Sequence, residues 1–339
     1  MRLNDDVAEN RSLTRWTDLL PRAPGQRGGV HETDAELVPL GDGRLLALTV
    51  DTVCEEIRLG LYRDPRTAGR LAAAAALSDL AAVGAEPLGL LLSVTLPVHD
   101  TDAVQEAVAR GVAETASAAG TFVLGGDTNE GDELSVGCTA AGTVPDGSEL
   151  RRLGIAPGDL LFSAGPLGLG AAVAASTLFG GGKLLPEEAL APPCRIAHGI
   201  ALRGLASAAM DTSDGLLATL DQLARLNGVA LHLTRPPEEL LDPRALDVAH
   251  RLALPPLSLL AAAQGEQELV FAVPPPRLPS LEAAAARLGW TPVPVGRAEA
   301  GHGIVVNGTP FDGARARNLL ASSGGDLRAY ASALVAMTR

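Results

Sequence analysis

The chain has 339 residues, of which 47% are hydrophobic, and its 27 basic and 40 acidic residues give a formal net charge of −13. This length is enough for two domains, each with its own core. The acidic balance argues against binding to the phosphate backbone of nucleic acids, and no apolar run approaches the roughly 18 residues of a membrane span. The N-terminus lacks a signal-peptide pattern, and the three cysteines are widely separated without metal-ligand spacing. We therefore expect a protein of the reducing cytoplasm.

The first half of the chain is typical of an α+β domain preceded by a helix. Residues 6–20 suit an amphipathic helix, and a linker rich in Pro, Gly and Arg follows. Strands are predicted at 35–39, 44–50, 88–96, 121–124 and 134–143, and helices at 66–84 and 101–119, the second capped at Asp100-Thr101. The alternating pattern of 134–143 predicts antiparallel pairing. A boundary near 145–158 gives an N-terminal segment (1–30), a first domain (31–148) and a second domain (149–339).

The second half begins with a strand at 159–164, followed by a glycine turn at 165–170 and a helix. The turn is more typical of tight packing than of a phosphate loop, because it fits neither common phosphate-binding pattern. Further strands are predicted near 207–211, 229–233, 268–273, 291–297 and 303–306. Helices are predicted at 195–206, 214–226, 243–252 and after Gly325, with the proline-rich stretches 235–237 and 274–279 as connections.

Four short acidic motifs stand out against this background: Val50-Asp51-Thr52, Ser78-Asp79-Leu80, Gly125-Gly126-Asp127-Thr128 and Asp211-Thr212-Ser213-Asp214-Gly215. Three of them follow predicted strands, so their carboxylates are expected at strand ends, and the second lies in a predicted helix. Carboxylates are the ligands that Mg²⁺ takes in phosphoryl-transfer sites. Each motif alone is also a common helix cap or turn.

The flanking residues indicate more than caps and turns, because several segments resemble one superfamily in order and spacing. The segments are 76–87 (ALSDLAAVGAEP), 124–128 (LGGDT), 152–159 (RLGIAPGD), 162–168 and 210–216 (MDTSDGL). The superfamily contains aminoimidazole ribonucleotide synthetase, selenophosphate synthetase, the hydrogenase maturation dehydratase and thiamine-monophosphate kinase. The likeness is strongest to thiamine-monophosphate kinase and covers about 35–271.

The resemblance implies two α/β domains, with the N-terminal domains forming a shared β-barrel in a homodimer and nucleotide near the interface. It implies ATP and Mg²⁺ as cofactors and a small phosphate or carboxylate substrate. The expected metal ligands or their neighbours are Asp34, Asp51, Asp79, Asp127, Asp211 and Asp214. The expected catalytic residues are Asp127, Asp214 and Arg152. The expected nucleotide contacts are Thr52, Ser78, Gly125, Gly126, Thr128 and Ser213.

This sequence departs from the family pattern at several positions. Thr33 stands where a first carboxylate is expected, Arg58 replaces a His, and Leu71 and Ala76 replace a Lys and an Asn. The segment 263–269 differs from the family's acidic C-terminal motif. Since the nucleotide and metal motifs are largely intact, we expect an altered acceptor site and poor activity with thiamine monophosphate.

Two alternatives remain open from the sequence. One is an ATP-dependent ligase or dehydratase of the same superfamily, although the cysteine-bearing tail of the hydrogenase maturation branch is missing. The other is a catalytically silent nucleotide-binding paralogue, which the changes at Thr33, Leu71 and Ala76 make credible.

Overall fold

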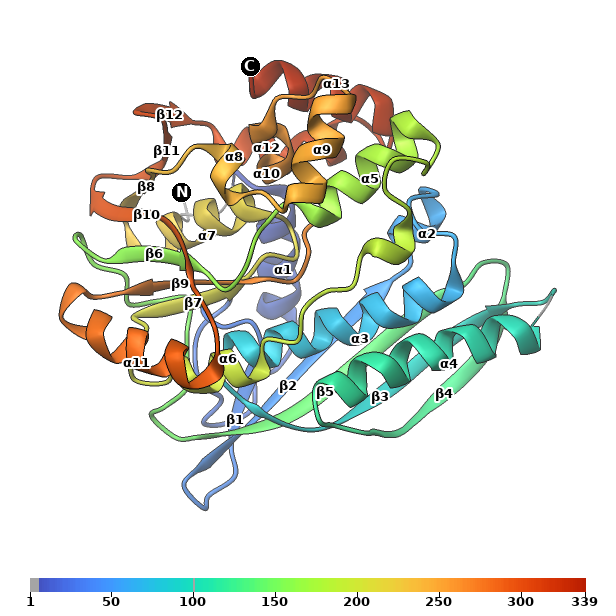
Figure 1. Cartoon of the computed structure of the whole chain (residues 1–339). Coiled ribbons are helices and arrows are strands. Elements are labelled where there is room, and N and C mark those ends of the chain that lie inside the picture. Colours follow the sequence, from blue (N-terminus) through green and yellow to red (C-terminus); the bar gives the residue numbers. More distant parts are fainter. Residues whose placement is uncertain (1–5, 100) are drawn as a thin grey trace.

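The computed structural model describes residues 6–99 and 101–339, which form two β-sheets with helices around them (Figure 1). Helix α1 (Ala8–Leu19) precedes the first sheet, as predicted. The other elements of this half are β1 (Glu36–Pro39), β2 (Arg44–Val53), α2 (Glu55–Arg58), α3 (Pro65–Ala82), β3 (Glu86–Pro97), α4 (Thr101–Ala118), β4 (Val123–Gly131) and β5 (Ser135–Pro145). The predicted Asp100 cap lies outside the described residues. Within those residues, no helix combines the length and apolarity needed to cross a bilayer.

The first sheet has the strand order β1-β2-β5-β3-β4. Strand β5 pairs antiparallel with both β2 and β3, which confirms the pairing predicted from its alternating pattern, and β3 and β4 are parallel. Helices α3 and α4 lie together on one face of this sheet (Figure 1). On the opposite face, Val50 is 67% exposed and Leu91 is 48% exposed. One face of the sheet is therefore core, and the other carries exposed apolar side chains.

The second half forms a seven-stranded mixed sheet with the order β12-β11-β8-β10-β6-β9-β7. Its strands are β6 (Leu160–Ser163), β7 (Ala208–Asp211), β8 (Val229–Leu233), β9 (Leu269–Val273), β10 (Val293–Ala300), β11 (Gly303–Val306) and β12 (Thr309–Phe311). Its α-helices are α5 (Leu169–Gly180), α6 (Ile196–Leu202), α7 (Leu216–Asn227), α8 (Pro237–Leu240), α9 (Pro243–Arg251), α10 (Pro256–Ala261), α11 (Leu278–Leu288), α12 (Gly313–Ser322) and α13 (Leu327–Met337). Short 3-10 turns lie at Glu187–Ala189 and Pro275–Arg277. The result is the predicted mixed α+β fold.

Helix α3 joins the two halves. Its N-terminus is capped by Asp64, whose carboxylate accepts hydrogen bonds from the backbone N–H groups of Arg66 and Thr67, and Pro65 occupies the first helical position. The alanine-rich body of the helix lets β2, β5 and α4 approach it closely. Its last turns reach α6, β7 and β9 of the second half. Residues Ser78 and Asp79 are thereby carried to the junction between the two sheets.

Two predicted strand boundaries were wrong. Strand β4 runs through Gly125-Gly126-Asp127-Thr128, and β2 runs through Asp51, so neither carboxylate lies at a strand end. The glycines of the first segment resemble a turn in sequence, but pairing with β3 extends the strand to Gly131. Asp211 does end its strand, as predicted.

The predicted connection at 274–279 was also wrong, because α11 begins at Leu278. Its prolines suggested a linker, but Pro279 stands in the first helical turn, where a missing backbone N–H costs little. Helices α2, α8, α10 and α12 and strand β12 were not predicted.

The fold requires a glycine where the segment before β9 crosses the segment after β7. A Cβ on Gly265 would lie 1.5 Å from the Thr212 carbonyl oxygen. We expect Gly265→Ala to lower the free energy of unfolding by about 3 kcal/mol or more, because backbone cannot relax as a flexible side chain can. Urea unfolding measures this. Gly125→Ala is the control, since its nearest neighbour would be a Leu91 methyl at 3.8 Å; equal destabilisation of the two variants would contradict the prediction.

Candidate metal and nucleotide site

Three predicted aspartates meet at the junction of the two sheets. One carboxylate oxygen from each of Asp34, Asp79 and Asp211 lies within 4.8 Å of the others. Asp34 precedes β1, Asp79 lies in the last turn of α3, and Asp211 ends β7. The acidic group is therefore assembled from distant parts of the chain, as the sequence predicted.

Hydroxyl groups and one arginine hold these carboxylates in place. The Ser78 hydroxyl donates to Asp211 Oδ2 at 2.6 Å, and the Thr49 hydroxyl donates to Asp79. Arg152 Nη2 donates to Asp34 Oδ1 at 2.8 Å, and the Asp34 side chain is only 1% exposed. The arrangement brings together the predicted residues Ser78 and Arg152. Thr49 was not predicted, because an alternating strand position carries no signal of its own.

Asp51 lies close to the same group, since its carboxyl interacts with those of Asp79 and Asp34. Burial, and the nearby charges of Asp34 and Glu56, raise the pKa of Asp51 to about 6. The buried oxygens Asp34 Oδ2 and Asp51 Oδ2 have no hydrogen-bond partner within the described residues. Buried carboxylate oxygens without donors are costly unless a proton or a cation satisfies them. These residues therefore fit a hard divalent cation such as Mg²⁺.

The group as a whole holds more carboxylates than cationic side chains can balance. Burial raises the pKa of Asp211 to about 7, with a further contribution from Asp34, while Ser78 and Arg152 oppose the rise. Burial and three neighbouring aspartates raise the pKa of Asp79 well above its usual range. Carboxyls this close cannot all ionise unless positive charge is added, which is the condition under which a metal is bound.

Asp214 and Ser213 lie beside this group on the segment between β7 and α7. The Ser213 hydroxyl donates to Asp211 Oδ1 at 3.0 Å. Burial raises the pKa of Asp214 to about 6, with Glu9 raising it further and Arg317 and Arg152 lowering it. The structure thus places Asp214 near both the site and the N-terminal helix.

The segment before β9, which the sequence associated with the acceptor through its departure from the family pattern, supports this part of the site. Thr212 donates to Glu266 Oε1 at 2.9 Å, and Glu266 Oε2 accepts from the backbone N–H of Gly168 at 2.6 Å. Glu268 is paired with Arg195 through Nε at 2.8 Å. The available signal was a pair of glutamates next to a buried strand, since such residues are rarely buried without partners.

Two of the remaining predicted residues, Asp127 and Thr52, lie on the other face of the first sheet. Asp127, Ser93, Gly137 and Thr52 are consecutive partners across four strands, and their side positions point away from α3. Three strand spacings place Asp127 about 14 Å from Thr52. Residues Gly125, Gly126 and Thr128 lie on the same exposed edge strand. Within one described chain, these residues are not brought to the acidic group.

The two halves match two domain descriptions of one family. Residues 32–144 match "AIR synthase related protein, N-terminal domain", and residues 156–308 match "AIR synthase related protein, C-terminal domain". A crystal structure of a protein from Thermus thermophilus aligns with a TM-score of 0.76 and 31% identity, covering 90% of this chain and 98% of that one. AaThiL complexed with AMPPCP and TMP aligns with a TM-score of 0.75 and 23% identity, covering 92% and 97%, which shows the shared fold. The fold is that of an AIR synthase related protein.

Comparison with the sequences of known proteins identifies a family within the AIR synthase related proteins. The thiamine-monophosphate kinase of Salmonella typhimurium is 33% identical over 264 residues, which cover 76% of this chain and 79% of that protein. The enzyme of Pyrococcus abyssi is 28% identical over 80% of this chain and 84% of its own length. The chain belongs to the thiamine-monophosphate kinase family.

The raised pKa values predict how pH and Mg²⁺ affect stability. A carboxyl whose folded pKa exceeds its unfolded pKa loses stabilising effect as pH rises between the two values, here from about 4 to about 7 for Asp211. We therefore expect the Tm of the wild type, minus that of Asp211→Asn, to fall between pH 5 and pH 8 in EDTA. Mg²⁺ should raise the wild-type Tm more at pH 8 than at pH 5, because protons compete with the cation.

The difference between the two Tm values cancels the contribution of His198, which changes stability with pH in the opposite direction. Burial lowers the pKa of His198 to about 4, and this residue is present in both proteins. A difference in Tm that stays constant with pH would contradict the electrostatic account of the acidic group.

Proposed function

We propose that the chain catalyses ATP- and Mg²⁺-dependent phosphoryl transfer to a small anionic metabolite. The observation that supports this most strongly is the acidic group formed by Asp34, Asp79 and Asp211, with Asp51 close to Asp79 and Arg152 hydrogen-bonded to Asp34. The relatives named thiamine-monophosphate kinase support the same reaction class. The residues that would hold Mg²⁺ from this chain are Asp34, Asp51, Asp79, Asp211 and Asp214.

Such a reaction needs positioning and charge neutralisation more than a strong base. A phosphate monoester acceptor has its second ionisation near pH 6, so its attacking oxygen is already largely anionic at neutral pH. Bound Mg²⁺ supplies positive charge to the nucleotide phosphates. Arg152 contributes a fixed cation at the same place, and Ser78 and Ser213 hold Asp211 in orientation. No nucleophilic side chain is required.

We further propose that the residues on the outer face of the first sheet complete the site of a second copy in a homodimer. Thr52 and Asp127 lie on the face opposite α3, beside the exposed apolar residues Val50 and Leu91. Burying this face against its own copy removes apolar surface from water, and the resulting two-fold interface is self-complementary. Asp127, with the backbone of Gly125 and Gly126 beside it, would then contact nucleotide or metal held by the partner.

This arrangement predicts complementation between inactive variants. Asp127→Asn and Asp214→Asn should each lose about 2–4 kcal/mol of transition-state stabilisation in an ADP-release assay, because each removes one charge from the metal–nucleotide site. If Asp127 serves the partner's site, a mixed dimer retains one intact site. Equal mixing of the two variants after subunit exchange should therefore recover roughly a quarter of wild-type activity.

Asp159→Asn is the control variant. Asp159 is buried and accepts from the Ser207 hydroxyl at 2.6 Å and the Ala156 N–H at 3.1 Å, away from the acidic group. It should keep its affinity for Mg²⁺ and ATP. No recovery in the mixture would place Asp127 and Asp214 in the same subunit's site, and wild-type rates in both variants would make them turn residues only.

The identity of the acceptor depends on positions where this chain departs from the family pattern. Leu71 is 6% exposed and Ala76 is fully buried, so these two replacements belong to the core of the first half. Arg58 is exposed at the end of α2, where it pairs with Glu55 at 3.3 Å. We propose that Arg58, with Gln267 beside Ser78, gives this chain an acceptor site different from that of its relatives, so that thiamine monophosphate is a poor substrate.

Restoring the family residue tests this proposal. We expect kcat/KM for thiamine monophosphate below about 10⁴ M⁻¹s⁻¹, the lower range for a natural substrate, and at least a fivefold rise in Arg58→His. Arg110→His is the matched control, because Arg110 is likewise exposed and paired with a glutamate on its own helix. A wild-type value above that range would identify thiamine monophosphate as the acceptor. ATP binding without turnover of any acceptor would favour the silent paralogue, and a ligated product would favour the ligase.

A further inference from the structure

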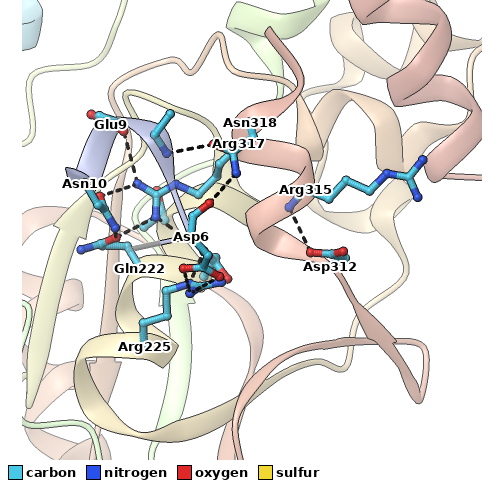
Figure 2. A network of polar contacts seen from close by, with 12 residues as sticks. Asp6, Glu9, Asn10, Gln222, Arg225, Asp312, Arg315, Arg317 and Asn318 are labelled. Atoms are coloured by element: carbon cyan, nitrogen blue, oxygen red, sulfur yellow. Dashed lines mark hydrogen bonds and ion pairs between the residues drawn. The ribbon is translucent and has the colours of Figure 1, made fainter. Parts of the chain in front are cut away.

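The N-terminal helix is fastened to the second half of the chain by a polar network centred on Arg317 (Figure 2). The Arg317 side chain is only 7% exposed. Its Nη2 atom donates to Glu9 Oε2 at 3.2 Å and to Asn10 Oδ1 at 3.1 Å, both on α1. Its Nη1 atom donates to Gln222 Oε1 at 2.7 Å and contacts Asp221 Oδ2 at 3.5 Å, both on α7. One guanidinium on α12 therefore joins three helices.

Neighbouring contacts fix the same helix a second time. Asn318 donates through Nδ2 to the Asp6 carbonyl at 2.7 Å and accepts from the Ala8 N–H at 2.9 Å. Asn10 Nδ2 donates to Gln222 Oε1 at 3.0 Å, and Asn10 is 2% exposed. Arg225 pairs with Asp6 at 2.8 Å. The beginning of α1 is thus bound to α7 and α12, although the chain continues from α1 into the first sheet.

Two sets of neighbouring residues connect helix α1 to the acidic group. Helix α7, on which Arg317 contacts Asp221 and Gln222, starts at Leu216, directly after the Asp214 segment. On the other side, the Asn10 backbone and the Arg152 guanidinium both lie close enough to the ring of His31 to affect its pKa, which burial and Arg152 lower. Arg152 in turn binds Asp34. Helix α1 therefore lies close to both the Asp214 segment and the Asp34 segment.

We propose that Arg317 is a positioning residue: by holding Glu9 and Asn10 of α1 against α7, it fixes the Asp214 segment and the His31–Asp34 segment relative to each other for binding of the metal–nucleotide complex. Both Arg317 and α1 lie outside the residues that match the two family domains, 32–144 and 156–308. The inference rests on the proposed function, since it concerns the same site.

Removing the Arg317 guanidinium should weaken the attachment of α1 to α7 and α12. Glu9 and Asp221 would each lose an ion-pair partner, and the side-chain oxygens of Asn10 and Gln222 would each lose a donor. The loss is costly for Asn10, Asp221 and Gln222, because these three residues are buried. The α12–α7 contact is too close to readjust around the gap. A Cβ on Gly313 would lie 2.4 Å from Asp221 Oδ1, so α12 already contacts this side chain at its limit.

The test compares Arg317→Met with Arg315→Met. Arg315 lies on the same helix, is exposed, and extends away from the network (Figure 2). By titration calorimetry with Mg²⁺ and the non-hydrolysable analogue AMPPCP, well below the Tm of each protein, we expect Arg317→Met to bind about tenfold more weakly, or about 1.4 kcal/mol. Arg315→Met should bind as the wild type does. Arg317→Lys should restore part of the affinity, because it returns the cation without the forked donors.

A spectroscopic signal separates positioning from general stability. The chain has two tryptophans: Trp16 on α1 is 62% exposed, and Trp290 is buried. In a Trp290→Phe background, the fluorescence anisotropy of Trp16 reports whether α1 is held. We expect Arg317→Met to lower this anisotropy, and saturating Mg²⁺ with AMPPCP to restore part of it.

The outcomes are distinct. If Arg317→Met lowers the Tm but keeps both its Trp16 anisotropy and an affinity within about twofold of the wild type, Arg317 is a packing residue and the inference is wrong. If it releases α1 without weakening AMPPCP binding, the helix is fastened there but does not position the site, and the inference is again wrong. A wild type that binds no AMPPCP would overturn the proposed function itself.

Discussion

The arrangement of the site depends on one constraint, the electrostatic repulsion between several buried aspartates. Asp34, Asp51, Asp79 and Asp211 come from four separate parts of the chain, and burial raises the pKa of the last three. A group of this kind costs folding free energy unless protons or a cation neutralise it. The surrounding hydroxyls and Arg152 offset part of this cost and orient the oxygens. Added positive charge would therefore stabilise this group of carboxylates.

Helix α3 makes this assembly possible because it belongs to the core of one half and ends in the other. Its small side chains allow close packing on β2 and β5, and its last turns contact β7 and β9. Adjacent residues of its final turns therefore have different partners: Asp79 faces Thr49 and Asp51 of the first sheet, while Ser78 reaches Asp211 of the second. Any shift of this helix would change the distances between carboxylates from both sheets at once.

The residues expected to bind nucleotide and metal are split between the two faces of the first sheet. Asp51 points toward α3, whereas its neighbour Thr52 and the more distant Asp127 point away, because side chains alternate along a strand. One chain thus presents one part of the site at the junction of its sheets and the other on an exposed face. The N-terminal helix adds a further component, since it comes from outside the family domains and still contacts the surroundings of both acidic segments.

The sequence by itself determined the mixed α+β class, most elements of the first sheet, and the set of aspartates that are candidates for the site. It did so because each acidic residue carries local signals: small neighbours, an adjoining apolar run and a family motif. Only the tertiary structure decided which of them meet. Asp127 and Asp79 look alike in sequence, yet one lies on an edge strand and the other in a helix between two sheets. Thr49, Glu266 and Arg317 carried no local signal, because their roles arise from partners at 30, 54 and more than 300 residues' distance along the chain.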